Sequence, residues 1–218
     1  TLIREFKMDL ETYEDLLSHG ECEWLEYKSF WYWNQNDKVI DEGWIEFIKD
    51  FCGLFNSLSP NYENKYLIFG YDEKKKESID YNIDTCGNEL EILSNLDSLK
   101  NEIIRKLKRR VKNFPPYKSS EDLEDLTSIF SLNEIEYNNK KQLIITIYNS
   151  PYLLKLKAEL GKGFKADNVI IRGLKKSDKS PENIIADYDK QTQLISLSEA
   201  NKINFFPEHE TTISQIVE

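Results

Sequence analysis

The stretch KYLIFGYD, residues 65–72, decides the fold of this 218-residue chain. Its run of apolar residues is typical of a buried strand, and such a strand would carry Asp72 at its far end. The stretch GECEWLEYK, residues 20–28, adds three glutamates and a lysine beside further strand-forming residues. Because hard divalent cations take oxygen ligands, acids collected at strand ends predict a cation site.

Hydrophobic periodicity extends the pattern along the chain. The predicted helices span 10–18, 44–55 and 90–111, with a short helix over 181–188 because proline suits a helix start. The predicted strands span 23–30, 66–71, 129–137, 142–148 and 165–172, with a hairpin turn at 138–141 (NNKK) and an extended hairpin or loop over 29–41. We therefore expect one α+β domain over residues 10–190, a mixed sheet flanked by helices, followed by a weakly patterned extension over 191–218.

Composition excludes several classes of protein. No apolar run approaches the roughly 20 residues that a membrane helix needs, and the first ten residues lack the continuous apolar core of a signal peptide. Cys22, Cys52 and Cys86 form no CxxC pair, which is typical of reduced thiols rather than of a zinc site or a disulfide framework. With only His19 and His209 present, a histidine-rich metal centre or a Ser-His-Asp triad is not expected. These features predict a soluble, cytoplasmic protein without a membrane partner.

Charge is unevenly distributed, although the formal net charge of −10 alone disfavours a nucleic-acid partner. Residues 98–120 carry eight basic groups against one acid, and residues 151–180 carry eight against three. The predicted nucleic-acid contacts are Arg105, Lys108, Arg109, Arg110, Lys112, Arg172, Lys175 and Lys176. Solvated helix and loop surfaces explain the same residues equally well. Trp31, Tyr32 and Trp33 either stack on unpaired bases or pack on the sheet edge or on a partner.

The order of these segments resembles the Schlafen-type, AlbA-like domain family. The matching motifs are Gly20-Glu21 with Leu25-Glu26-Tyr27-Lys28, a helix ending at Asn56, Leu67-Ile68-Phe69-Gly70-Tyr71-Asp72, Pro151-Tyr152, and Val169-Ile170-Ile171-Arg172-Gly173. Together they fall within residues 13–188, in the family's order. The chain departs from the family in three places. The usual Gly-Gly before the central strand is absent, residues 29–43 are inserted, and Arg172-Gly173-Leu174 replaces an Arg-Arg-Gly turn.

The resemblance implies a metal-dependent endoribonuclease that cleaves structured, tRNA-like RNA and serves as a stress or phage-defence effector. The family's two glutamates fall on Glu21 and Glu26 and its aspartate on Asp72, with Glu23 as a local competitor, and these acids would hold Mg²⁺ or Mn²⁺. Since Glu21 and Glu26 would face opposite ways on one regular strand, their convergence requires Glu21 to lie in the turn before the strand. Lys28, on the same strand face as Glu26, would stabilise charge on the transferring phosphate.

Two other functions stay open. The first is a non-catalytic nucleic-acid-binding or regulatory module of the same fold. The second is a subunit that contacts only proteins. ATP binding is not expected, because Gly161-Lys162-Gly163 lacks the preceding glycine and following Ser/Thr of a phosphate loop. The expected partners are RNA, favoured over DNA, and either a second copy of the chain or a larger defence complex.

Overall fold

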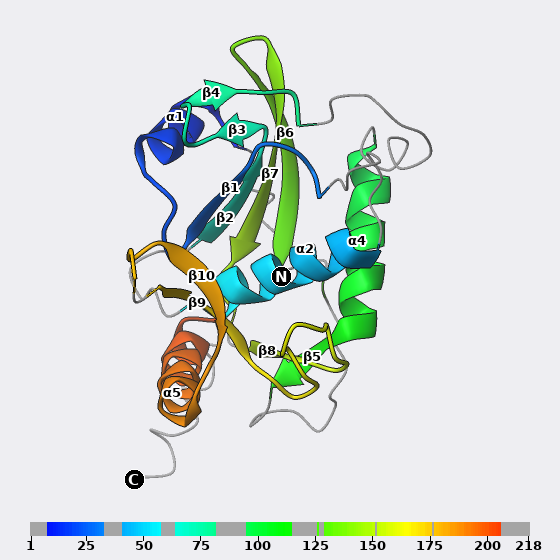
Figure 1. The fold of residues 1–218 in the computed structure, drawn as a ribbon, viewed down its shortest axis with the longest axis vertical. Helices are drawn as coiled ribbons and strands as arrows, with labels where there is room; N and C mark the ends of the chain where they lie inside the picture. The colour runs from blue at the N-terminus through cyan, green and yellow to red at the C-terminus, as the bar shows by residue number, and fades with distance from the viewer. Residues whose placement is uncertain are drawn as a thin grey trace, which may run out of the picture.

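The computed structural model describes residues 8–32, 41–57, 64–81, 95–114, 126, 129–150, 152–175 and 177–205, with backbone alone for 199–205. The helices are α1 (Leu10–Ser18), α2 (Asp41–Phe55), α4 (Leu96–Arg110) and α5 (Tyr188–Phe205). The strands are β1 (Leu25–Lys28), β2 (Asn64–Phe69), β3 (Tyr71–Asp72), β4 (Glu77–Ser78), β5 (Val111–Phe114), β6 (Phe130–Tyr137), β7 (Lys140–Tyr148), β8 (Leu153–Leu156), β9 (Ile170–Leu174) and β10 (Pro181–Ile185). A mixed sheet flanked by helices confirms the predicted α+β class (Figure 1).

A four-stranded sheet in the order β1-β2-β7-β6 forms the centre of the fold. Strand β1 runs parallel to β2, whereas β7 is antiparallel to both β2 and β6. Helix α2 packs on the face that carries Leu67 and Phe69, and α1 packs on the opposite face with Tyr66 and Ile68. Because successive strand residues face opposite ways, burial of both faces explains the continuous apolar run in β2.

The predicted strand over 66–71 is interrupted at Gly70, whose φ is +97°. A Cβ atom at this position would lie 2.6 Å from the carbonyl oxygen of Ile79, so glycine is required by both conformation and space. The chain bends there, and β3 pairs with β4 in a separate hairpin in which Asp72 lies opposite Glu77. Residues 73–76 form the turn of this hairpin.

The β6–β7 hairpin confirms the predicted strands and shortens the predicted turn. Asn138 and Asn139 both adopt left-handed φ values, 52° and 56°. Two consecutive residues of this kind make the tight hairpin turn whose twist matches the strands, and asparagine tolerates that conformation well.

The helix predicted over 181–188 is wrong, because Pro181–Ile185 forms strand β10, antiparallel to β9. Pro181 is the first residue of its strand, a position where a missing N–H is tolerated in a sheet. Part of the tail expected to be weakly patterned forms α5, whose Leu194 joins a small core with Val169 and Ile171. Strands β5 and β8, which pair with each other, were not predicted from hydrophobic periodicity.

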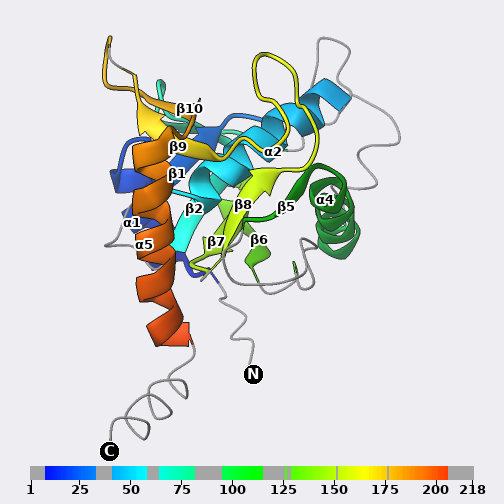
Figure 2. The ribbon, with the colours of Figure 1, turned by 90° about the horizontal axis from the view of Figure 1, so that it is seen from below.

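Helix α2 occupies the middle of the molecule. Figure 2 shows α4 and α5 on opposite sides, with α2 between them. In the described part of the chain, no helix combines the length and apolar character that crossing a membrane requires. The start of the helix predicted over 90–111 lies outside the described residues, as do Trp33 and Cys86.

Candidate functional site

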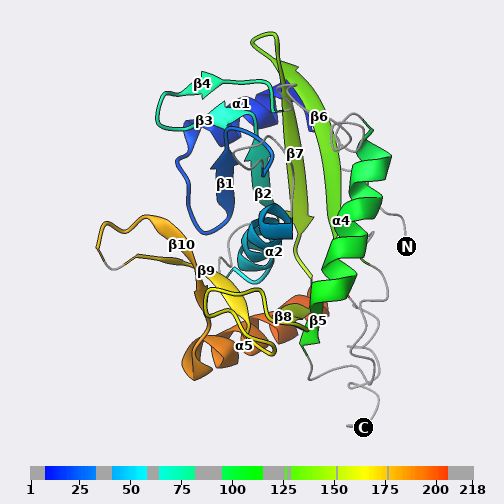
Figure 3. The same ribbon diagram turned by 45° about the vertical axis from the view of Figure 1, so that its right-hand side comes forward.

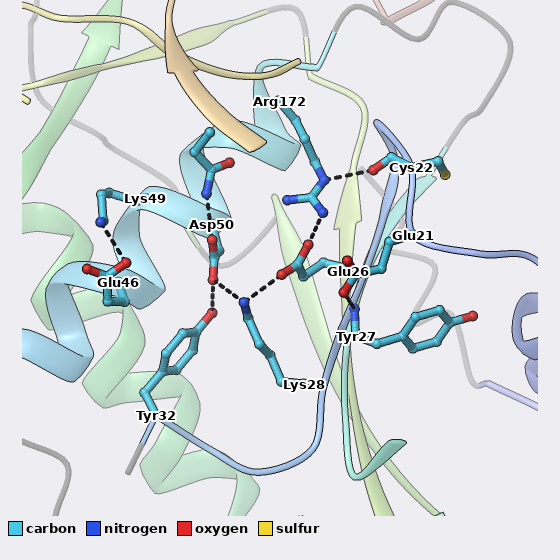
Figure 4. Close-up of polar contacts among 11 residues, drawn as sticks. Glu21, Cys22, Glu26, Tyr27, Lys28, Tyr32, Glu46, Lys49, Asp50 and Arg172 are labelled. Carbon is cyan, nitrogen blue, oxygen red and sulfur yellow. Dashed lines mark hydrogen bonds and ion pairs between the residues drawn. The ribbon is translucent and has the colours of Figure 1, made fainter. Parts of the chain in front are cut away.

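The candidate site begins in the turn that precedes β1. The N–H of Cys22 donates to the carbonyl oxygen of Leu25 (3.0 Å), which closes a tight turn at the start of the strand. Glu21 therefore lies outside β1, as its convergence with Glu26 required. The backbone N–H of Tyr27 donates to the Glu21 carboxylate (3.2 Å) and fixes the side chain beside the strand (Figure 4).

A second acid, Glu73, meets Glu21 from the β3–β4 turn. Its Oε1 atom accepts a hydrogen bond from the N–H of Glu21 (2.8 Å). Burial raises the pKa of the Glu21 carboxyl, and the neighbouring charge of Glu73 raises it further, against the opposing effect of the Tyr27 N–H. Two acids from stretches far apart in the sequence are thus held together in a partly buried place.

Glu26 lies at the centre of a buried ion-pair cluster. One carboxylate oxygen pairs with Lys28 Nζ (2.5 Å), and the other accepts a hydrogen bond from the guanidinium of Arg172 on β9. Only 6% of Glu26 and 4% of Arg172 is exposed. Arg172 Nε also donates to the carbonyl oxygen of Cys22 (2.7 Å), and burial lowers the pKa of the guanidinium. Both Glu26 oxygens are therefore engaged by cations.

Asp50 of α2 extends this cluster, although the sequence analysis did not select it. Its carboxylate pairs with Lys28 (3.1 Å) and accepts hydrogen bonds from Tyr32 Oη (2.6 Å) and Asn183 Nδ2 (2.5 Å). Burial, and then the charge of Asp50, raises the pKa of the Tyr32 hydroxyl. The sequence contained a signal for this residue. Asp50 lies three residues after Phe47 on the apolar stripe of the predicted helix, and a charge in that position needs partners.

The contacts of Asp72 lie within its own hairpin. Its Oδ1 atom accepts hydrogen bonds from the N–H groups of Lys74 and Lys75, both at 3.1 Å, and thereby shapes the β3–β4 turn. Glu73, one position later, is the acid that reaches Glu21. The sequence offered a signal here, since neighbouring residues at a strand end point in opposite directions.

The predicted phosphate contacts are distributed over several surfaces. Arg172 is buried beside Glu26, Lys175 is exposed on the β9–β10 turn, and Lys176 lies outside the described residues. On and beside α4, Lys108 and Arg109 are exposed, Arg105 pairs with Glu102, Arg110 donates to the carbonyl oxygen of Glu159, and Lys112 pairs with Asp167.

Helix α4 meets α2 at the end opposite to the ion-pair cluster. Lys106 lies 3.6 Å from the carboxylate of Asp41, the first residue of α2, whereas Asp50 is about 13 Å further along that helix axis at ~1.5 Å per residue. Figure 3 shows α4 on the far side of α2 from β1. Helix α4 and the acids Glu26 and Asp50 therefore belong to different parts of the molecule.

Trp31, three residues after β1, belongs to the core, and Tyr32 packs against it. Trp31 is 2% exposed and packs against Trp44, Phe47 and Phe69, with ring centroids 4.8–5.7 Å apart. Packing is thus the role of this tryptophan, and stacking on bases would require it to leave the core.

The acidic side chains of the site can be compared with the ligands that Mg²⁺ or Mn²⁺ would need. Within the described ranges, no three His, Cys, Asp or Glu residues are grouped as metal ligands. Mg²⁺ does not need such a cage, since it commonly keeps waters and takes one or two carboxylates together with substrate phosphates. Glu21 and Glu73 each accept one backbone N–H at Oε1 and would offer Oε2 to the cation. Both oxygens of Glu26 pair with cationic side chains, and both oxygens of Asp72 make contacts within its own turn.

Comparison with known proteins adds no relative. No family model matches the chain, and no curated protein matches it significantly. The resemblance to Schlafen-type domains therefore rests on the motifs quoted above.

Proposed function

We propose that this chain is a metal-dependent endoribonuclease of Schlafen type that cleaves structured, tRNA-like RNA. The observation that carries the proposal is the hydrogen bond from the backbone N–H of Glu21, before β1, to the carboxylate of Glu73, after β3 (2.8 Å). Glu26 and Lys28 lie on the adjoining strand. The pKa of the Glu21 carboxyl is raised by burial, and acids with a perturbed pKa are common at sites that bind or activate a charged group.

The proposed roles follow from the contacts of each side chain. Glu21 and Glu73 would hold Mg²⁺ or Mn²⁺, which would polarise a phosphoryl oxygen and lower the pKa of a bound water. Lys28 is held between Glu26 and Asp50 but keeps 29% of its side chain exposed, so it is available to a phosphate oxygen. Arg172 is a positioning residue, because it holds Glu26 and the Cys22 carbonyl rather than facing solvent.

The biological setting is part of the same proposal. We place the activity in the cytoplasm, where reduced thiols such as Cys22 and Cys52 are expected, as an effector of stress or phage defence. A second copy of the chain or a larger defence complex is the proposed assembly, and no ATP is required.

The test is cleavage of a labelled tRNA in Mn²⁺ and in EDTA. Glu21→Gln and Glu73→Gln keep a hydrogen-bond acceptor but remove the charge, and each should slow cleavage by at least about 100-fold. Glu77→Gln is the matched control, since Glu77 is an exposed acid on the same hairpin. It should cleave like the wild type.

Asp72→Asn separates the two assignments of the third acid. If Asp72→Asn abolishes cleavage while Glu73→Gln does not, the assignment made from the sequence holds and the Glu21–Glu73 pair is irrelevant to the reaction. Cleavage that persists in EDTA would overturn the need for a divalent cation.

A non-catalytic nucleic-acid-binding module is the second candidate. The observation that favours it is the engagement of Glu26, since both carboxylate oxygens pair with Lys28 and Arg172. A wild-type protein that binds RNA in a salt-sensitive way but never cleaves it would support this candidate. A protein that does neither would contradict both and favour a subunit that contacts only proteins.

A further inference from the structure

Two hairpins hold neighbouring residues of the turn before β1. Glu73, in the β3–β4 turn, accepts the N–H of Glu21 (2.8 Å), while Arg172, on β9, donates to the carbonyl oxygen of Cys22 (2.7 Å). Figures 1 and 3 show both hairpins on the left-hand side of the molecule. The backbone of the consecutive residues Glu21 and Cys22 is therefore contacted by both hairpins.

The β3–β4 turn presents three consecutive exposed lysines, Lys74, Lys75 and Lys76. Asp72 fixes their backbone by accepting two N–H groups, and Lys76 adopts a left-handed φ of 55°. Lys75 reaches the Asp72 carboxylate only loosely, at 3.7 Å. Over the described ranges, Lys74 and Lys76 have no carboxylate within ion-pairing distance. These charges are held on an ordered backbone and are available to an anion.

The β9–β10 turn repeats this arrangement. Lys175 and Lys179 are exposed, and the turn is closed by a hydrogen bond from the N–H of Lys175 to the carbonyl oxygen of Ser180 (2.8 Å). Lys179 adopts a left-handed φ of 61°. The acid of this turn, Asp178, accepts hydrogen bonds from the N–H and hydroxyl of Ser180. These bonds, and to a smaller extent the charge of Lys175, lower the pKa of Asp178.

Helix α4 is a poorer anion surface than its composition predicts. Arg105 and Lys106 both pair with Glu102, Arg110 donates to a backbone carbonyl, and Lys112 shares Asp167 with Lys155. The helix also meets the end of α2 that lies away from Glu21. Three basic groups of the helix, Arg105, Lys106 and Arg110, are thus engaged, while Lys108 and Arg109 are exposed on a helix that lies away from Glu21.

We infer that the sugar–phosphate backbone of RNA binds across the two hairpin turns, through Lys74–Lys76 on one side and Lys175 and Lys179 on the other, and not along α4. The inference rests on the proposed function, because it takes RNA as the polyanion. A backbone held in this way passes over Glu21, where the two acids meet. Binding through lysines to phosphates is non-specific in sequence and strongly salt-dependent.

The test compares three variants that each lose two positive charges. One alters the β3–β4 turn, one the β9–β10 turn and one α4, and asparagine replaces each left-handed lysine because it tolerates that conformation. The variants are K74Q/K76N, K175Q/K179N and K108Q/R109Q. Binding of a labelled tRNA is measured by fluorescence anisotropy in EDTA over a series of KCl concentrations, and thermal melting checks that each variant folds.

Each turn variant should bind about tenfold more weakly, with the slope of log K against log salt reduced by about 0.7 to 0.9 per lost phosphate contact. The α4 variant should stay within about twofold of the wild type. Equal losses in all three variants, or a loss confined to the α4 variant, would overturn the inference while leaving RNA as the substrate. Absence of tRNA binding by the wild type would overturn both the inference and the proposed function.

Discussion

The two ends of α2 meet similar charges in different surroundings. At the C-terminal half, Asp50 pairs with Lys28 while its side chain is 9% exposed. At the N-terminal end, Asp41 pairs with Lys106 while its side chain is 86% exposed. Exposed pairs contribute little because water and salt compete for each charge, whereas a buried charge left without its partner is strongly destabilising.

The comparison teaches that charge density along the sequence is a poor guide to the site. The basic run of α4 is the most conspicuous charged segment of the chain, yet it lies at the solvated end of α2. The buried end collects two charges from β1 and one each from α2 and β9, three elements that are remote in sequence and come together only in the fold.

Removing Arg172 should give the largest effect on stability. Arg172→Met leaves the Glu26 carboxylate buried with one cation instead of two, and loss of one partner of a buried pair typically lowers the free energy of unfolding by about 3–5 kcal/mol. Urea denaturation at pH 7 measures the change.

Arg105→Met is the matched control from the solvated side, because Arg105 is an exposed arginine of α4 paired with Glu102. Its stability should not change measurably. The double variant Glu26→Gln/Arg172→Met should recover much of the loss, since it removes the stranded charge as well. Equal stabilities for Arg172→Met and Arg105→Met would show that the two ends of α2 do not differ as described.

Local pattern was sufficient for several elements. The apolar spacing of 10–18 and 44–55 predicted α1 and α2, whose stripes contact the two faces of the sheet. The run at 66–71 predicted β2, and the asparagines at 138–139 predicted the β6–β7 hairpin. In each case neighbouring residues determine the structure.

Elements that depend on distant pairing were not predictable in this way. Pro181 suggested a helix start, but pairing with β9 overrode that local preference. Over residues 188–198, where its side chains are described, helix α5 buries Leu194 and Ser198, so its apolar periodicity is weak there. The ion pair between Glu26 and Arg172 joins residues 146 positions apart, and no local pattern indicates it. The choice between Asp72 and Glu73 depends on the bend at Gly70.

A second prediction compares lysines at the two ends of α2. Lys65 donates to the carbonyl oxygen of Phe55, the last residue of α2 (3.1 Å), and burial lowers its pKa from 10.5 to about 8. The unfolded chain therefore binds one more proton than the folded chain between these values. The contribution of Lys65 to the free energy of unfolding should rise with pH across this window.

Lys65→Met removes that dependence. Relative to this variant, the wild type should gain about 2 to 3 kcal/mol between pH 7 and pH 10, at about 1.4 kcal/mol per pKa unit. Chemical denaturation at several pH values measures the difference, in which ionisation of the thiols common to both proteins cancels. Lys106→Met, at the solvated end, should show no such trend. A difference that is flat with pH would mean that Lys65 is not buried as a charged group.

The smallest expected effect concerns the pair of acids at the candidate site. Burial and the charge of Glu73 raise the pKa of Glu21, so the folded chain binds more protons than the unfolded chain above pH 4.5. The contribution of Glu21 to stability should therefore fall as pH rises from 4.5 through its folded pKa. This sign is opposite to that of Lys65, because the neutral forms of an acid and a base lie on opposite sides of their pKa values.

Glu73→Gln should shift the Glu21 titration to lower pH, since it removes the neighbouring charge and keeps an acceptor for the Glu21 N–H. The shift is modest because burial, the larger cause, is unchanged. NMR titration of the side-chain carboxyl carbons measures it directly, with Glu77→Gln as the control on the same hairpin. An unshifted Glu21 in Glu73→Gln would mean that the two carboxylates do not interact, and the site would lose the feature that distinguishes it from the solvated acids around it.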